Sequence, residues 1–103
     1  MSKYKNIKVM YKGIKFDSKR EFERYLVLED MQKKGKLSDL RLQVPYVLID
    51  KSCFGRAIKY VADFVYIKDN QTIVEDVKGV KTPVYRLKKR MLAERYGIEI
   101  NEV

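Results

Sequence analysis

The sequence lacks histidine and contains a single cysteine, Cys53. These absences exclude a serine or cysteine nucleophile served by a histidine base, an internal disulfide, and a zinc site built from cysteine and histidine. The five glycines, at positions 13, 35, 55, 79 and 97, are too dispersed to form a phosphate-binding loop or a dinucleotide-binding motif. Catalysis is therefore left to carboxylates, lysines, tyrosines and any metal ion that the carboxylates bind.

Long apolar runs are also absent. No segment approaches the roughly 20 apolar residues that span a bilayer, and the basic start MSKYKNIK lacks the apolar stretch of a secretory signal. We therefore expect a cytoplasmic protein with no membrane partner. A chain of 103 residues, 46% hydrophobic and 36% charged, predicts one globular domain over residues 1–103.

Positive charge is concentrated in two parts of the chain. Lysine and arginine number 23 against 14 acidic residues, which gives a net charge of +9. Residues 1–20 carry a net +6 and residues 81–96 a net +5, whereas residues 21–80 hold ten basic and ten acidic side chains. Basic patches favour a polyanion such as DNA or RNA, because each neutralised phosphate releases a counterion. A merely soluble surface is the alternative.

Periodicity and turn signals predict an α/β fold in which a short hairpin precedes a helix, three strands, a helix and a strand. Ser18 and Glu21 form a capping box at the start of the first helix, and Thr82 with Pro83 starts the second. Pro45 predicts a strand with a free edge. The predicted bounds are 7–16 for the hairpin, 18–35 and 82–97 for the helices, and 40–48, 58–67, 72–78 and 98–103 for the strands.

Apolar residues at helical spacing indicate which face of each predicted helix is buried. The first helix has its predicted stripe at Phe22, Tyr25, Leu26, Leu28 and Met31. The second helix has its predicted stripe at Val84, Leu87, Met91 and Leu92.

Three charged residues on the second and third strands indicate a site for chemistry. Asp76 and Lys78 share one strand face because they are two residues apart, and a hairpin turning at Asp69-Asn70 brings Asp63 near them. Two carboxylates bind a hard divalent cation, and a neighbouring lysine orients water or stabilises charge on phosphorus. A buried salt bridge between Asp63 and Lys78 is the structural alternative.

Asp63, followed by Asp76-x-Lys78 on the next strand and preceded by the helix start SKRE, resembles the PD-(D/E)xK nuclease superfamily. Ala62 stands where that motif has proline, and Asp76 is the middle acid. The stretches SKRE, LQVPY, ADFVY, EDVKG and YRLKKRML are similar to small phage-encoded proteins described as endonucleases of the Holliday-junction-resolvase type. This similarity covers residues 11–98.

The resemblance implies a restriction-endonuclease-like αβββαβ core with a mixed sheet, and a metal-dependent DNA endonuclease. Glu21, Asp63, Asp76 and the carbonyl of Val77 would hold Mg²⁺, or Mn²⁺ in its place, and Lys78 would position the attacking water. The implied substrate is branched or duplex DNA, with a Holliday junction as first choice, in phage or mobile-element recombination. For a phage-encoded protein the compartment is the host cytoplasm.

Several further assignments remain as alternatives. Glu21 either binds metal or only caps its helix, and Gln43 is a candidate neighbour of the active site. Because resolving a junction takes two symmetric cuts, we expect a homodimer. A DNA-binding protein without catalysis and a nuclease subunit that depends on a protein partner are the rival functions. Phosphate contact is predicted for residues around the second helix, namely Lys81, Tyr85, Arg86, Lys88, Lys89 and Arg90.

Overall fold

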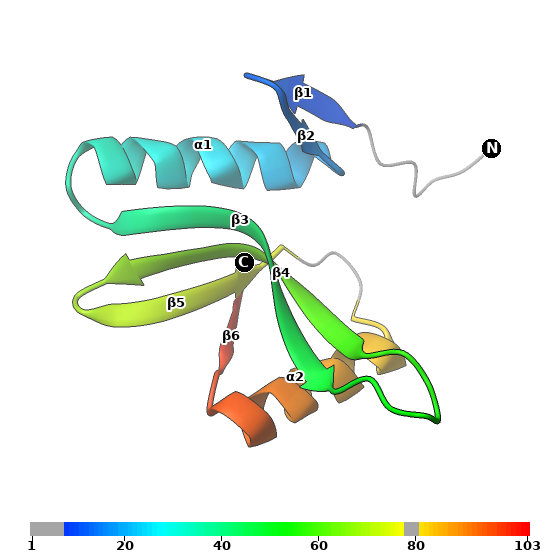
Figure 1. Cartoon of the computed structure of the whole chain (residues 1–103). Helices are drawn as coiled ribbons and strands as arrows, with labels where there is room; N and C mark the ends of the chain where they lie inside the picture. The colour runs from blue at the N-terminus through cyan, green and yellow to red at the C-terminus, as the bar shows by residue number, and fades with distance from the viewer. Residues whose placement is uncertain (1–7, 78–80) are drawn as a thin grey trace.

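The structure, a computed structural model, describes residues 8–77 and 81–103. An N-terminal antiparallel hairpin precedes two helices and a mixed four-stranded sheet, which confirms the predicted α/β fold (Figure 1). No helix in this described part of the chain is long and apolar enough to cross a membrane. The elements are β1 (Val9–Tyr11), β2 (Ile14–Phe16), α1 (Lys19–Lys33), β3 (Ser38–Ile49), β4 (Ile58–Lys68), β5 (Gln71–Asp76), α2 (Pro83–Tyr96) and β6 (Ile100–Glu102).

The four main strands lie in the order β3-β4-β5-β6. β4 pairs antiparallel with both β3 and β5, whereas β6 runs parallel to β5 after the connection through α2. β3 is therefore one of the two edge strands of the described sheet, and Pro45 lies in it as predicted. The turn at Asp69 and Asn70 is also confirmed, because both residues adopt positive φ values between β4 and β5.

α1 begins where the capping signal predicts. The Ser18 hydroxyl accepts a hydrogen bond from the Glu21 amide at 3.1 Å. Glu21, Tyr25 and Leu28 form the buried face of the helix. Leu26, predicted on this face, is 36% exposed. Leu26 lies two positions before Leu28, and at about 100° per residue this turns its side chain toward the opposite side of the helix.

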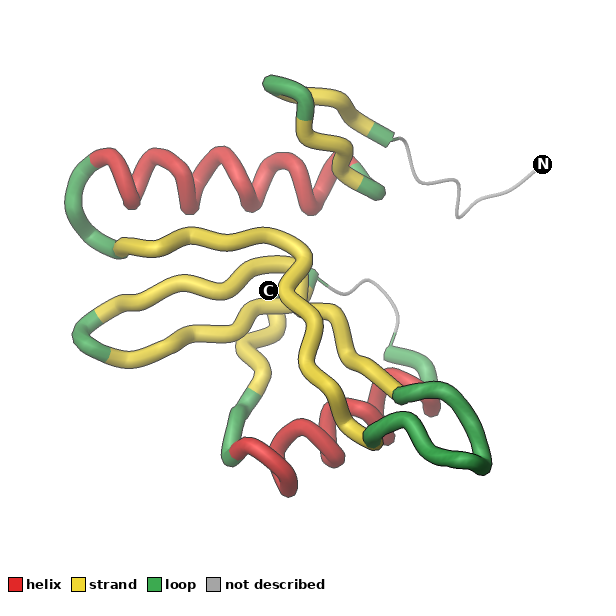
Figure 2. The backbone as a smooth tube through the Cα atoms, viewed as in Figure 1, coloured by secondary structure: helices red, strands yellow, loops and turns green. Residues whose placement is uncertain are grey.

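The β3–β4 hairpin passes from one hydrophobic core to another at a bend. Leu40 and Leu42 pack in the core shared with α1, whereas Val44 and Tyr46 pack in the core shared with α2. All four occupy even positions of one strand, so a regular strand would keep them on one face. Gln43 lies between the two pairs with a φ of 52°, outside the extended region. The tube shows that the β3–β4 hairpin is bent (Figure 2).

The predicted apolar stripe of α2 is partly wrong. Leu92 is buried and Met91 is partly buried, but Val84 and Leu87 are 62% and 60% exposed. Tyr85 faces the core instead. Its ring removes more apolar area from water than a valine side chain does, and its hydroxyl finds a carboxylate acceptor at the edge of the core. The helix is therefore rotated so that Tyr85, and not Val84, contacts the sheet.

A buried ion pair joins α1 to β5. The Arg24 guanidinium donates to both carboxylate oxygens of Glu75, at 2.9 Å from Nε and 2.7 Å from Nη2. The Glu75 side chain has no exposed surface, and its Oε2 also accepts a hydrogen bond from the Tyr66 hydroxyl. A buried carboxylate is costly unless it is paired and hydrogen-bonded. These donors therefore allow Glu75 to lie inside the protein and fix α1 against the sheet.

We predict that Arg24→Ala lowers the free energy of unfolding by about 3 kcal/mol, because it leaves the Glu75 carboxylate buried with the Tyr66 hydroxyl as its donor. Urea unfolding followed by circular dichroism measures the change. Arg20→Ala is the matched control, since Arg20 donates to the Val103 carbonyl in an exposed contact. Equal stabilities of the two variants would contradict the structural role of the ion pair.

Candidate functional site

Three carboxyl groups from three different elements meet beside the bend. Glu21 comes from the first turn of α1, Asp63 from the middle of β4 and Asp76 from the end of β5. Glu21 and Asp76 are 7% and 1% exposed, and Asp63 is partly buried. Asp63 interacts with both of the other acids through side-chain hydrogen bonds. The structure thus brings together the three acids that the sequence predicted as one group.

Neighbouring donors hold the two aspartates in place. At the end of β5 the Val77 amide donates a hydrogen bond to Asp63 Oδ2 at 2.8 Å. The Tyr60 hydroxyl donates to Asp76 Oδ2 at 2.6 Å. Each aspartate therefore has one carboxylate oxygen fixed by the strand beside it.

Burial and mutual repulsion raise the pKa of two of these acids. For Asp63 the largest cause is loss of solvent, and the negative charge of Glu21 adds to it, while hydrogen bonds with Asp76 and Val77 act in the opposite direction. Burial also raises the pKa of Glu21, and the charges of Asp17 and Asp76 add to the rise. A cation bound between these acids would oppose both effects, because it favours their charged forms.

The chemistry of this donor set fits a hard divalent cation. Carboxylate oxygens are the ligands that Mg²⁺ and Mn²⁺ prefer, and Glu21, Asp63 and Asp76 each supply one carboxylate group. Among residues 8–77 and 81–103, however, no group of three or more acidic or cysteine side chains is so arranged that it could hold a metal ion. Binding therefore requires the side chains to shift so that the carboxyl oxygens not held by the Tyr60 hydroxyl and the Val77 amide face a common centre.

Two other predicted residues of the site differ in outcome. Lys78 lies outside the described residues, and so does its alternative role as an ion-pair partner of Asp63. Gln43 is exposed and lies opposite Asp63 in the register of β3 and β4, between two paired neighbours on each strand. The bend in the hairpin therefore coincides with the position of Asp63.

Sequence reasoning missed two residues that support the acidic cluster. Tyr60 lies in the core at 4% exposure, and its hydroxyl also donates a hydrogen bond to Asp76. Arg24 was assigned no role. The available signal was helical spacing, since Arg24 lies one turn after Glu21 and its partner Glu75 directly precedes Asp76.

The basic face of α2 is smaller than predicted, because several of its residues bind one carboxylate. The Tyr85 hydroxyl lies 2.6 Å from a carboxylate oxygen of Glu102, and the ammonium groups of Lys81 and Lys89 lie 3.1 and 3.2 Å from this carboxylate. These donors, Tyr85 first, lower the pKa of Glu102 to about 2. Tyr85 is also buried at 6% exposure. The predicted contact of Tyr85 with nucleic acid is therefore corrected to a core position.

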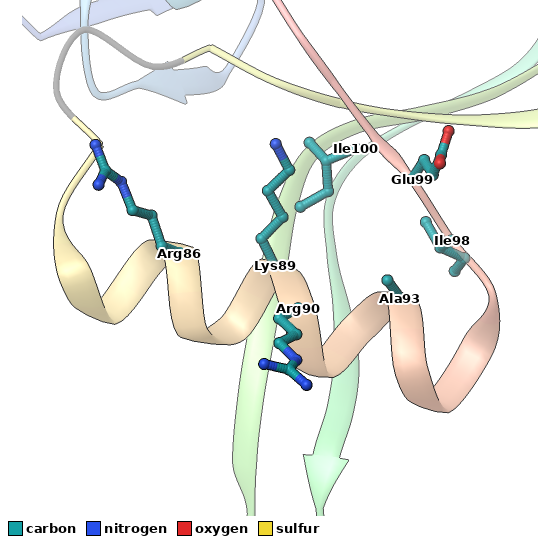
Figure 3. A pocket seen from close by; sticks show the side chains of 7 residues that line it. All are labelled: Arg86, Lys89, Arg90, Ala93, Ile98, Glu99 and Ile100. Carbon is teal, nitrogen blue, oxygen red and sulfur yellow. The ribbon is translucent and has the colours of Figure 1, made fainter.

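The remaining cations that the sequence predicts as phosphate contacts differ in their exposure. Arg86 and Arg90 are exposed, and Lys88 is partly exposed. Arg86, Lys89 and Arg90 line one side of a cavity of about 430 Å³ between α2 and the segment leading into β6 (Figure 3). Glu99 lies across this cavity from the arginines.

The fold and site define a small α/β protein with a bent mixed sheet and an acidic cluster at the bend. The chain belongs to the family described as "Protein of unknown function (DUF1064)", whose model matches residues 1–102. No curated protein and no solved structure matches the chain. Family membership is thus established, whereas the function rests on the chemistry of the site.

We predict that Asp63→Asn raises Tm at pH 8 in EDTA. The folded protein holds a proton on Asp63 more tightly than the unfolded chain does, because the folded-state pKa lies above its ordinary value of 3.8. The destabilising effect of the ionised acid is therefore complete above the folded-state pKa and disappears as the pH falls toward 3.8. Asparagine removes the charge and its amide oxygen still accepts the Val77 amide, so the gain in Tm should shrink between pH 8 and pH 4.

Thermal unfolding of both proteins across this pH range provides the measurement. Asp69→Asn is the matched control, because the same change is then made in an exposed turn. A lowered Tm for Asp63→Asn at pH 8 would contradict repulsion within the cluster and would favour a stabilising ion pair of Asp63.

Proposed function

We propose that the protein is a metal-dependent endonuclease that hydrolyses phosphodiester bonds in DNA. The observation that carries this proposal is the meeting of Glu21, Asp63 and Asp76, which come from separate elements and interact in a largely buried place. Acids with strongly perturbed environments are typical of functional sites, and a cation site explains why three are kept together. The resemblance to PD-(D/E)xK nucleases and the net charge of +9 support the same function.

Each residue has its own proposed role in hydrolysis. Glu21, Asp63, Asp76 and the Val77 carbonyl are the proposed ligands of Mg²⁺, with Mn²⁺ as a substitute. When bound, the ion supplies positive charge to the phosphodiester and acidifies water. Lys78, outside the described residues, is proposed from its place in the sequence to orient the attacking water. In-line attack on phosphorus breaks the bond to the 3′ oxygen and leaves a 5′-phosphate.

Tyr60 and the Val77 amide act in this proposal as positioning groups. The hydrogen bond from the Tyr60 hydroxyl holds one oxygen of Asp76 and so restricts the rotation of that carboxyl group. The Val77 amide does the same for Asp63. Restricting both groups before substrate arrives reduces the reorganisation that binding requires.

The proposed substrate is branched DNA such as a Holliday junction, cut by a homodimer during phage or mobile-element recombination. One chain supplies one acidic cluster, and two symmetric cuts require two clusters related by a two-fold axis. β3 is the longer of the two edge strands of the described sheet and offers a surface for pairing. A DNA-binding protein without catalysis, and a nuclease that needs a protein partner, are the alternatives that the following experiment separates.

We predict that Glu21→Gln, Asp63→Asn, Asp76→Asn and Lys78→Ala each lower the rate of DNA cleavage by about 10³-fold or more. Loss of a metal ligand or of the water-orienting group removes several kcal/mol of transition-state stabilisation. Nicking of a supercoiled plasmid and of a four-way junction with Mg²⁺ or Mn²⁺ measures cleavage. Fluorescence anisotropy in EDTA measures DNA binding, which we expect to change by less than about threefold, since the cations of α2 remain.

Glu23→Gln is the control for Glu21→Gln, because Glu23 is exposed on the same helical turn. Glutamine also supports a helix cap, so a merely capping Glu21 would leave cleavage at the parent rate in Glu21→Gln. Binding without any cleavage by the parent protein would assign it as a non-catalytic DNA-binding protein. Cleavage that appears only after addition of host extract would assign it as a partner-dependent subunit.

We predict that the double variant Arg86→Ala, Arg90→Ala weakens binding to every DNA sequence alike. Removing one phosphate-binding side chain should reduce the slope of log K against log salt concentration by about 0.9, so the double variant should reduce it by about 2. Binding titrations between 50 and 200 mM NaCl measure this slope. Lys33→Ala, Lys34→Ala is the control with the same change in charge at the far end of α1. An equal reduction of the slope in both variants would indicate a general charge effect instead of phosphate binding at α2.

A further inference from the structure

The loop between β3 and β4 presents an aromatic ring to solvent. Phe54 is 95% exposed, more than any other large hydrophobic residue in the described chain. The backbone around it is nevertheless held firmly. Ser52 and Gly55 exchange two backbone hydrogen bonds, at 3.0 and 3.2 Å, and the Ser52 hydroxyl accepts the Phe54 amide at 3.1 Å. A closed turn thus holds the ring outward.

The position of this turn keeps the ring away from either core. β5 pairs with residues 64–68 of β4, whereas residues 58–62 pair only with β3 among the described strands. The outer half of the hairpin therefore projects beyond β5 and carries the loop at its end (Figures 1 and 2). At about 3.3 Å per residue, the tip lies on the order of 20 Å from Asp63.

Positive charge surrounds the ring. Lys51 and Arg56 flank it in the loop, both are exposed, and within residues 8–77 and 81–103 neither forms a salt bridge. The one acidic residue of the loop, Asp50, is paired with Arg95 at 3.4 Å. Further along, Lys59 of β4 and Lys88 of α2 line the same pocket, so cationic side chains continue from the tip to α2.

A planar ring between cations matches the chemistry of nucleic acid. Bases stack on aromatic rings, and lysine and arginine bind the phosphates on either side. An intact duplex buries the faces of its bases, whereas a branch point or a strand end exposes them. The exposure of the Phe54 ring to water is unfavourable, and a base face that covers the ring would remove this apolar area from water.

We propose that Phe54 stacks on an exposed base at a branch point or strand end, with Lys51 and Arg56 on the adjacent phosphates. This inference rests on the proposed function because it takes nucleic acid as the ligand, but it does not require that the protein cleaves DNA. Because the tip is far from Asp63, the stacked base lies several nucleotides from the bond that is cut. The tip therefore selects DNA structure while the acidic cluster carries out the chemistry.

The experiment uses Phe54→Trp, because the chain contains no tryptophan and the emission then reports on position 54 alone. The protein is titrated in EDTA with a four-way junction, a duplex with a single-stranded overhang, and a covalently closed circular duplex of equal charge. We expect stacking to quench the emission strongly with the first two ligands and weakly with the third. Equal quenching by all three, or none, would overturn the proposal.

Substitution tests the same inference independently of fluorescence. Phe54→Ala should weaken binding to the junction by about tenfold and binding to the closed duplex by less than about twofold, whereas Phe54→Tyr should bind like the parent. Val27→Ala is the control, since it removes an apolar side chain that is 47% exposed on α1. Tm of Phe54→Ala should equal that of the parent. Unchanged junction binding by Phe54→Ala overturns the stacking role.

These measurements also separate this inference from the proposed nuclease activity. If the parent protein does not cut DNA and Phe54→Ala binds the junction more weakly than the parent, the stacking role is supported and the proposed nuclease activity is rejected. Cleavage by the parent with unchanged binding by Phe54→Ala retains the nuclease and removes the stacking role. A second copy of the chain is the other possible partner of Phe54, and sedimentation without DNA tests for it. A dimer in the parent protein that is lost in Phe54→Ala would show that the tip contacts another copy, and would overturn the proposal.

Discussion

The ion pair between Arg24 and Glu75 is the constraint on which the acidic cluster depends. The Glu75 carboxylate is buried, the contact with Arg24 is bidentate and the Tyr66 hydroxyl joins it, so the pair fixes α1 in both position and rotation relative to β5. Glu21 lies one helical turn before Arg24, and Asp76 directly follows Glu75. The pair that holds the layers together therefore also sets the separation of two of the three acids in the cluster.

The bend in the β3–β4 hairpin separates the acidic cluster from the exposed loop that contains Phe54. At Gln43 the hairpin leaves the core shared with α1 and enters the core shared with α2, and Asp63 lies opposite this residue. The inner half of the hairpin consequently places an acid beside Asp76. The outer half carries Phe54 to the end of an arm. A straight hairpin would have extended one continuous core and left no such junction for the acids.

Local rules predicted the elements and part of the site, and they failed where distant contacts decide. The proximity of Asp63 and Asp76 followed from a hairpin turn between two strands, which is a local property. The alternating pattern does not reveal the bend at Gln43, because the apolar residues before and after it all occupy even positions. The prediction that Val84 and Leu87 are buried is wrong because helical spacing considers only which positions are apolar. It does not take into account that Tyr85 can be buried when its hydroxyl has a hydrogen-bond partner, Glu102, on another element.

The signs of the pKa shifts separate an acid whose charge stabilises the fold from two acids whose charges oppose folding. The pKa of Glu102 is lowered by Tyr85 and two lysines, so its charge stabilises the folded state at neutral pH. The pKa values of Glu21 and Asp63 are raised, so their charges oppose folding there. Asp76 is paired in register with Glu102, which places the two kinds of site on neighbouring strands. The chain has nine more basic than acidic residues, so it has enough cations to neutralise every acid. That Glu21 and Asp63 nevertheless repel each other is consistent with a site that binds a metal cation from solution.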